Sequence, residues 1–334
     1  MVGIFRNFNP LGIIFLFFYG LVLRFAAFVM PQVPVANEGD GFLYKIILSF
    51  LSPVGKPLPV VYSILAYLLV FIQAMMVNGL VNHYRMLSRS TFLPAMSYIL
   101  VASLFPEWWE FSAALLINTL VVWIWSQMTG LYNNQRALSV LFSTGVVLGL
   151  CSLIYFPSVA FVLLMILSLV VMRPFKLAEW VVALISVTIP YYILFAWLYL
   201  SNKWNPSEFI HGISIHYPGF KQDLWALGGV FLLIVPFLAS GYYIQGNILR
   251  MLIQVRKSWS LLLLYLLTAL IVPFISPSGS FAYWILCVPP FAAFHSNVYL
   301  QADRKWIPAL LHWAMVLFIL ALNIYVLSNP GQAG

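Results

Sequence analysis

The stretch PLGIIFLFFYGLVLRFAAFVM, residues 10–30, decides the class of fold. It is one apolar run with a single charge, Arg24, and a helix of about 20 apolar residues is long enough to cross the hydrocarbon of a bilayer. Similar runs recur along the 334 residues, of which 63% are hydrophobic and 7% charged. Soluble domains carry roughly a quarter charged residues. The chain is therefore predicted to be an all-α, polytopic membrane protein, because barrel strands would alternate polar and apolar residues.

About eleven transmembrane helices are predicted in a single integral membrane domain, residues 1–334. Their approximate ranges are 10–30, 59–82, 92–106, 110–131, 137–155, 158–172, 179–200, 223–244, 259–275, 281–299 and 306–327. Between the first two runs, Phe42 to Ser52 is apolar but only about a dozen residues long, and prolines follow it. It is too short to cross a bilayer, so we expect a helix that lies at the outer interface.

The charges predict the orientation of these helices. With a cytoplasmic N-terminus, the inner loops hold eleven of the sixteen cations, which is the usual bias of short loops. These cations are Arg6, Arg85, Arg89, Arg136, Arg173, Lys176, Arg250, Arg256, Lys257, Arg304 and Lys305. We therefore expect a bacterial inner-membrane protein with a periplasmic C-terminus. The net charge of +8 then reflects membrane orientation and does not indicate a nucleic-acid partner.

The loop Asn37-Glu38-Gly39-Asp40-Gly41 contains the most conspicuous polar residues. Glu38 and Asp40 are two residues apart, so both carboxylates can face one bound group or cation, or act as a general base. A solvated acidic loop without function is an equal alternative. Arg24 lies about 9 Å below the outer end of the first helix. It is expected to snorkel, to pair with Glu38 or Asp40, or to contact a lipid phosphate through its bidentate guanidinium.

A second polar segment, residues 201–222, separates the seventh and eighth runs and is expected to face outward. It contains Lys203, His211, His216 and Lys221, which can supply cations for a phosphate or carry a proton. Polar loop residues without function are an equal alternative. The histidine spacing does not suggest zinc, and no metal ligand is assigned.

Other motifs limit the possible functions. Residues 107–110, Glu-Trp-Trp-Glu, are typical of an aromatic belt at a membrane interface. No phosphate-binding loop, Gly-x-Ser-x-Gly elbow or His-Glu-x-x-His helix is present. We also expect no buried Asp or Glu within the spans, which argues against an ion-coupled transporter.

The order of these features resembles the C superfamily of membrane-embedded glycosyltransferases, which use polyprenyl-phosphate-linked sugars. The resemblance rests on Leu23-Arg24-Phe25, on Glu38-Gly39-Asp40, on the apolar stretch that follows, and on a hairpin from Gly145 to Pro157 that leads to Arg173-Pro174. It covers about residues 10–200, the glycosyltransferase-C-like core, before the outer loop 201–222 and the C-terminal helices 223–327. The whole chain also resembles a family of uncharacterised multi-pass inner-membrane proteins from Bacteroidota.

The resemblance implies a transferase that moves a sugar from a lipid-phosphate donor at the outer face of the membrane. It makes Asp40 or Glu38 the catalytic base. The groups that it implies for binding the substrate phosphate are Arg24, Lys203, His211, His216 and Lys221. No cofactor is implied, although a divalent cation between Glu38 and Asp40 is left open.

The chain departs from the superfamily because it has no sizeable outer domain. Two alternatives to the enzyme therefore stay open. The first is a non-catalytic membrane subunit of an envelope complex for secretion, assembly or lipid handling, with membrane or periplasmic protein partners. The second is a carrier of a lipid or a lipid-linked sugar.

Overall fold

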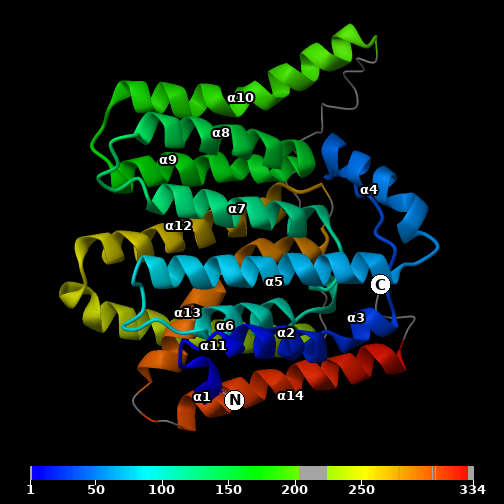
Figure 1. Cartoon of the computed structure of the whole chain (residues 1–334), viewed down its shortest axis with the longest axis vertical. Helices are drawn as coiled ribbons and strands as arrows, with labels where there is room; N and C mark the ends of the chain where they lie inside the picture. Colours follow the sequence, from blue (N-terminus) through cyan, green and yellow to red (C-terminus); the bar gives the residue numbers. More distant parts are fainter. Residues whose placement is uncertain (1, 203–223, 278, 303, 305, 330–334) are drawn as a thin grey trace.

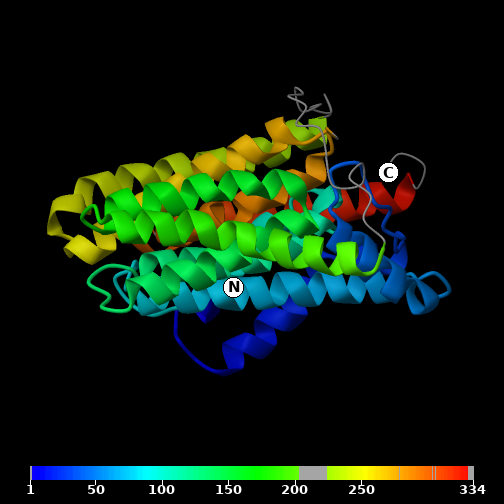
Figure 2. The ribbon, with the colours of Figure 1, turned by 90° about the horizontal axis from the view of Figure 1, so that it is seen from above.

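The computed structural model describes residues 2–202, 224–277, 279–302, 304 and 306–329, and the regular elements in these residues are all helices. The long helices run side by side along one axis (Figures 1 and 2). Six are long and apolar enough to cross a membrane, which confirms the polytopic helical class. They are α5 (Val60–His83), α8 (Ala137–Ile154), α10 (Leu177–Leu200), α11 (Leu224–Asn247, continued by η4, Ile248–Arg250), α12 (Ile253–Ile275) and α14 (Trp306–Ser328).

The remaining predicted spans contain shorter helices, so eleven crossings stay a prediction. These helices are α2 (Leu11–Leu23), α6 (Leu93–Ala102), α7 (Ala113–Thr129), η2 with α9 (Phe156–Ala160 and Phe161–Met172) and η5 with α13 (Phe281–Cys287 and Val288–Gln301). Every residue of α6 is buried, as is α13 up to its last residue, and the two pack together in the bundle. Ten helical residues cover only about 15 Å. Such a short helix is stable at membrane depth because protein surrounds it.

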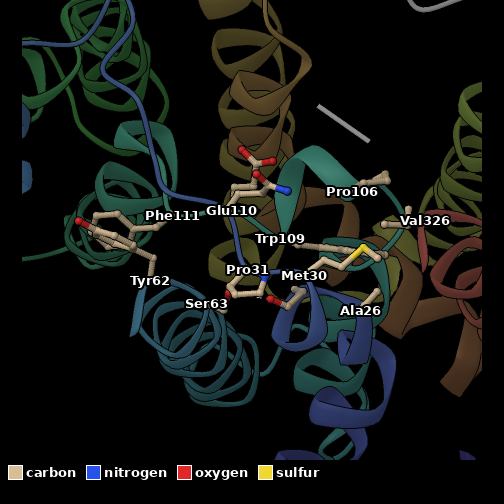
Figure 3. A pocket seen from close by; sticks show the side chains of 12 residues that line it. Ala26, Met30, Pro31, Tyr62, Ser63, Pro106, Trp109, Glu110, Phe111 and Val326 are labelled. Atoms are coloured by element: carbon tan, nitrogen blue, oxygen red, sulfur yellow. Dashed lines mark hydrogen bonds between the residues drawn. The ribbon is translucent and has the colours of Figure 1, made fainter. Parts of the chain in front are cut away.

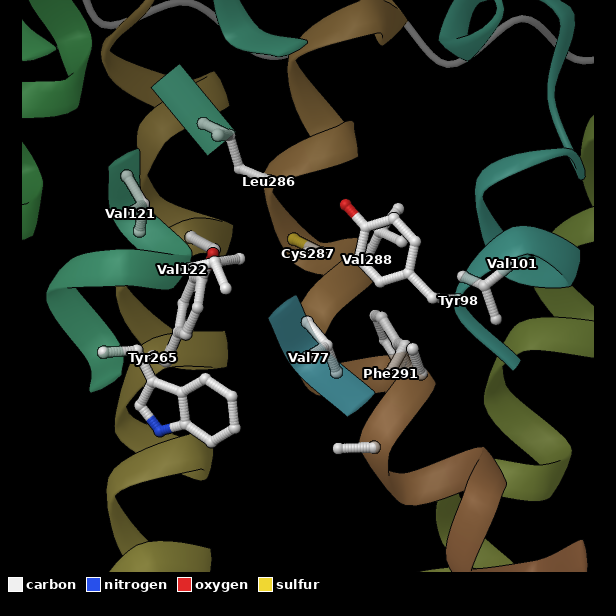
Figure 4. Packing of buried hydrophobic residues seen from close by; sticks show 14 of the residues in the cluster. Val77, Tyr98, Val101, Val121, Val122, Tyr265, Leu286, Cys287, Val288 and Phe291 are labelled. Atoms are coloured by element: carbon white, nitrogen blue, oxygen red, sulfur yellow. The ribbon is translucent and has the colours of Figure 1, made fainter. Parts of the chain in front are cut away.

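Around α6 the core is packed with apolar side chains (Figure 4), and it also contains a buried hydrogen-bond network. Gln73 on α5 accepts a bond from the Tyr98 hydroxyl at 2.6 Å, and Asn118 on α7 donates to the same hydroxyl at 2.9 Å. The Tyr265 hydroxyl on α12 completes the network by donating to Asn118 at 3.2 Å. Polar contacts of this kind stabilise helix association where lipid removes the hydrophobic driving force.

The loops gather at two opposite ends of the bundle (Figure 1). We call one the arginine end: it holds the loops 84–92, 130–136, 173–176 and 248–252, with Arg85, Arg89, Arg136, Arg173 and Arg250. The other, the first-loop end, holds residues 31–41 and 103–112. The loops therefore alternate as the charges predict. Which end faces the cytoplasm stays a prediction.

Helix α4 (Phe42–Gly55) follows the first loop and lies obliquely to the long helices at the first-loop end (Figure 1). It is three residues longer than the predicted interfacial helix and contains Pro53. Its apolar residues gather on one side more strongly than in the long helices, which suits a helix lying at an interface.

One expectation about buried acids is wrong. Glu179, in the first turn of α10, is buried, and its two carboxylate oxygens accept hydrogen bonds from Arg173, each at 2.9 Å. The same guanidinium donates to the backbone carbonyls of Leu131 and Asn134. The pair thus ties the α9–α10 turn to the α7–α8 turn, and the arginine compensates the buried charge.

Candidate functional site

The first loop is held against the middle of the chain by backbone hydrogen bonds. The Gly41 N–H donates to the Ile154 carbonyl at 2.8 Å, and the Phe156 N–H donates to the Gly39 carbonyl at 3.2 Å. These two bonds flank one antiparallel β-bridge between Asp40 and the residue that joins α8 to η2. Residues 39–41 are therefore fixed against the bundle, whereas Asn37 and Glu38 just before them are exposed.

Asp40 is the buried member of the acidic pair, with 2% of its surface exposed. Its Oδ2 atom accepts a hydrogen bond from the Asn37 N–H at 2.8 Å, whereas Oδ1 is buried with no hydrogen-bond partner. Burial raises the pKa of Asp40 to about 6, although the Asn37 N–H and the Lys45 charge oppose the shift. At neutral pH the group is an ionised carboxylate that binds a proton more readily than an ordinary aspartate.

Tyrosines surround this carboxylate. Tyr155, opposite Asp40 in the bridge, stacks on Tyr283 with ring centroids 4.6 Å apart. Tyr44, on the first turn of α4, is buried and donates a hydrogen bond from its hydroxyl to the Phe111 carbonyl at 3.1 Å. Burial and then the neighbouring Asp40 charge raise the pKa of Tyr44, so its phenol stays protonated. Tyr44 thus connects the first loop with residue 111.

Glu38 has a different environment from Asp40, although the two are close in sequence. Its side chain is exposed, while Asp40 is buried. Within the described residues, no group of three or more His, Cys, Asp or Glu side chains is arranged to hold a metal ion. A divalent cation between Glu38 and Asp40 remains a proposal.

Arg24 interrupts the first helix, because its backbone lies between α2 and α3 (Phe25–Val29) in a non-helical conformation, with φ −114° and ψ 24°. Its side chain is buried and turns toward the α6–α7 connection. It donates to Ser103 Oγ at 3.3 Å, to the Trp108 carbonyl at 3.2 Å and to the Ala102 carbonyl. The ion pair with Glu38 or Asp40 is not formed. One guanidinium nitrogen, Nη1, is buried without a partner.

The helix break at Arg24 exposes backbone groups that a distant side chain satisfies. Asn323 on α14 donates to the Leu23 carbonyl at 2.9 Å and accepts from the Ala26 N–H at 2.8 Å. Buried backbone groups left unpaired would cost the desolvation free energy of each. This amide therefore compensates for the interruption, and the sequence alone gave no signal for it.

A cavity of about 220 Å³ lies next to this break, at the first-loop end (Figure 3). Its walls come from α3, α5, the segment around η1 (Pro106–Trp108) and α14. The lining is partly polar and includes Gln32, Tyr62, Ser63, Trp109 and Glu110. It can therefore accept a ligand group that forms hydrogen bonds.

A separate apolar groove of about 400 Å³ lies between α4, α5 and α7. Its lining side chains are Ile46, Ile47, Phe50, Leu51, Leu65, Leu69, Phe111 and Leu116. Phe111 lines both the groove and the polar cavity. At the first-loop end, the polar cavity and the apolar groove are thus both in contact with Phe111.

The aromatic belt predicted for residues 107–110 is not what the structure shows. Trp108 and Trp109 are buried, and their indole N–H groups donate to the carbonyls of Phe281 and Ser103, each at 3.1 Å. They pack inside the bundle because the α6–α7 connection folds inward onto Arg24. Their indoles therefore do not form a lipid-facing belt.

The predicted residues of the segment 201–222 cannot be placed with the others. Lys203, His211, His216 and Lys221 lie outside the described residues.

The structure adds groups that the sequence did not single out, namely Tyr44, Lys45 and Tyr155. Lys45 is exposed and is a near neighbour of the Asp40 charge. Lys45 follows the acidic loop by about one helical turn, so its proximity to Asp40 could have been predicted from the sequence.

The described helices define a class, a multi-pass helical membrane protein, and the comparison with solved structures shows the glycosyltransferase-C fold. No protein-family model matches the sequence, and no curated protein matches it. Among solved structures, it is similar to the crystal structure of ArnT from Cupriavidus metallidurans bound to undecaprenyl phosphate. The TM-score is 0.52 with 15% sequence identity over 94% of this chain.

The likeness to ArnT concerns the fold alone, because the sequence identity is low. The chain spans 64% of the length of ArnT. The fold expected from the resemblance is thereby confirmed, while membership in a Bacteroidota family and the catalytic roles of the individual residues stay predictions.

Proposed function

We propose that this protein is a membrane glycosyltransferase that takes a sugar from a polyprenyl-phosphate donor at the first-loop end of the bundle. The observation that carries the proposal is the junction at Phe111, where a polar cavity and a wholly apolar groove meet. An amphiphile with a polar head and a prenyl chain matches this pair of surfaces. That ArnT, which shares the fold, was crystallised with undecaprenyl phosphate supports the same class of ligand.

In the proposed reaction Asp40 is the general base. Its free Oδ1 takes the proton of an acceptor hydroxyl while the acceptor oxygen forms a bond to the anomeric carbon of the sugar. The bond from that carbon to the phosphate oxygen breaks, and its electron pair leaves with the polyprenyl phosphate. A base of pKa near 6 suits this step, since it is ionised at neutral pH yet binds the proton as the reaction proceeds.

The leaving phosphate needs a positive charge close by. Among the described residues, Lys45 is the cation best suited to bind the leaving phosphate, because its side chain is exposed and its charge acts on Asp40. Arg24 is held by three protein groups, so only its Nη1 atom is available, and its contribution is mainly to shape the cavity wall. The cations of the segment 201–222 remain proposed partners of the same phosphate.

The test uses the purified protein with a panel of polyprenyl-phosphate-linked sugars, and the readout is released polyprenyl phosphate measured by mass spectrometry. We expect turnover in the native protein and a loss of about 10²- to 10⁴-fold in Asp40→Asn. Polyprenyl phosphate should raise the melting temperature of both proteins, because the variant retains the lipid surfaces. Glu38→Gln, at the exposed acid, should have a much smaller effect.

The rival reading is a non-catalytic membrane subunit. It would be supported if Asp40→Asn retained full function in cells and the native protein co-purified with a stoichiometric partner. Equal stabilisation by polyprenol and polyprenyl phosphate would contradict recognition of the phosphate head.

A further inference from the structure

The loop between α5 and α6 lies at the arginine end, far from the first loop (Figure 1). Its residues form a polar basin. The basin encloses about 270 Å³. Its lining residues are Asn82, Arg85, Leu87, Ser88, Arg89 and Ser90. Two arginines and two serines thus line one small concave surface made by a single loop.

This loop is built as a closed and supported ring. The Asn82 amide donates to the Thr91 carbonyl at 2.9 Å and accepts from the Thr91 N–H at 3.2 Å, which ties the two ends of the loop together. Met86 and Leu87 are buried beneath it with 3% and 5% of their surface exposed. The backbone that carries the polar side chains is therefore fixed at its two ends by the Asn82–Thr91 hydrogen bonds and in between by the buried Met86 and Leu87.

Arg85 occupies a backbone conformation that usually belongs to glycine. Its φ is 51°, and the Met86 N–H donates to the Val81 carbonyl at 3.0 Å, which closes α5 with the hydrogen bond of a helix C-cap. Left-handed backbone is unfavourable for a residue with a Cβ atom. The helix end therefore holds a guanidinium at a position where glycine would fit the backbone better.

The basin is rich in donors and lacks a neutralising acid. Ser88, Arg89 and Ser90 donate no backbone hydrogen bond to another described residue. Within the described part of the chain, the carboxylate at this end is Glu179, and Arg173 already pairs with it. Guanidinium groups and free N–H groups together favour an anion, and the bidentate fork of arginine matches phosphate oxygens.

An aromatic side chain beside the loop suggests where such a phosphate comes from. Phe8 is 59% exposed and stacks on Phe92, at the end of the loop, with ring centroids 4.8 Å apart. A lipid carries apolar chains next to its phosphate, so an exposed apolar ring beside a phosphate-binding loop fits a lipid better than free phosphate. We propose that the basin binds the phosphodiester headgroup of an anionic phospholipid, with Arg85 and Arg89 contacting the phosphate.

The test measures lipid binding to the full-length protein in detergent by native mass spectrometry. The probes are phosphatidylglycerol, diacylglycerol as a lipid without phosphate, and inorganic phosphate as a competitor. We expect the native protein to bind phosphatidylglycerol but not diacylglycerol. Arg85→Gln with Arg89→Gln should weaken this binding about thirtyfold, since a basic side chain near charged lipid contributes roughly a factor of five.

Two further variants separate binding from folding. Arg85→Gly removes the guanidinium yet relieves the left-handed backbone, so we expect an equal or higher melting temperature with weaker lipid binding. Arg136→Gln with Arg250→Gln changes two exposed arginines that lie at the same end but outside the basin. This double variant should leave phosphatidylglycerol binding to the basin unchanged. Displacement of the lipid by an equal concentration of inorganic phosphate would assign the basin to free phosphate and overturn the lipid proposal. Unchanged phosphatidylglycerol binding in both basin variants would overturn it as well.

Discussion

Asp40 and Tyr155 face each other in one antiparallel β-bridge, which joins the first loop to the end of α8. The bridge holds a carboxylate in a buried position although it belongs to a short polar loop. It also explains the glycine that follows the acid. A Cβ atom at Gly41 would meet the backbone of Leu153 and Ile154, whereas a Cβ atom at Gly39 would meet only the side chains of Pro277 and Tyr155, at 3.2 Å and 3.4 Å.

Gly41→Ala should therefore displace Asp40. A Cβ atom at this position would lie 2.1 Å from the Leu153 carbonyl oxygen, a backbone atom that cannot rotate away. We expect a loss of stability of about 1–3 kcal/mol from the clash and loss of any activity that depends on the carboxylate. Thermal unfolding in detergent, together with the transfer assay, measures both.

Gly79→Ala is the matched control for that variant. Gly79 lies in α5, and a Cβ atom there would meet nothing within 4 Å. Alanine in a helix interior is favoured over glycine by about 0.5–1 kcal/mol, so this variant should be slightly more stable and fully active. An equally stable and active Gly41→Ala protein would show that the bridge does not fix the loop.

The stability of the protein should fall as the pH rises and Asp40 ionises. Burial raises its pKa to about 6 in the folded protein, above the value near 4 of an unfolded chain. The folded state then keeps the proton to higher pH, so this stabilising contribution is complete below pH ~4 and is lost as pH rises through 6. The total is at most about 3 kcal/mol.

Asp40→Asn should remove this part of the pH dependence. The amide oxygen can still accept the Asn37 N–H, and no buried charge forms at neutral pH. We expect the variant to unfold at a higher temperature than the native protein at pH 8 and at a similar temperature at pH 5. A variant that is less stable at pH 8 would mean that the ionised carboxylate has a stabilising partner.

The class of fold follows from apolar runs in the sequence, because length and hydropathy alone determine what can cross a bilayer. The helix ends follow less closely: α12 begins at Ile253, six residues before the predicted span, so Arg256 and Lys257 lie in the helix and not in a loop. The first loop was also recognisable from its charges. What the sequence could not distinguish was Asp40 from Glu38. Only the pairing with residues more than one hundred positions later buries one acid and leaves the other exposed.

Arg24 and Glu179 show a second limit of the sequence. Arg24 bonds to residues 78 to 84 positions later, and Glu179 pairs with Arg173, six residues before it. A hydropathy pattern does not say which carbonyls or cations will lie beside a polar side chain. The buried α6 was ambiguous for a related reason. Its residues are apolar on all sides, which fits both a membrane span and an interior helix.

Arg24 is predicted to stabilise the fold more than it binds ligand. Arg24→Lys cannot reproduce three donated hydrogen bonds from one planar group, so carbonyls near η1 lose their partner. We expect a loss of about 1–3 kcal/mol for each carbonyl left unpaired, visible in thermal unfolding without any lipid. Asn323→Leu, which frees the backbone groups at the same helix break, should lower stability by about 1–3 kcal/mol per unpaired group. Native stability of Arg24→Lys together with loss of lipid binding would instead assign the guanidinium to the ligand.

The Arg173–Glu179 pair offers a test of how the arginine end is held together. Both side chains are largely buried, at 12% and 5% exposure, so removing one charge leaves the other without compensation. Glu179→Gln alone should cost about 3–5 kcal/mol. The double variant Arg173→Met with Glu179→Gln leaves no buried charge, and we expect it to be more stable than the sum of the single changes implies. The readout is a double-mutant cycle of unfolding free energies in detergent, and strictly additive single effects would show that the two side chains do not act as a pair.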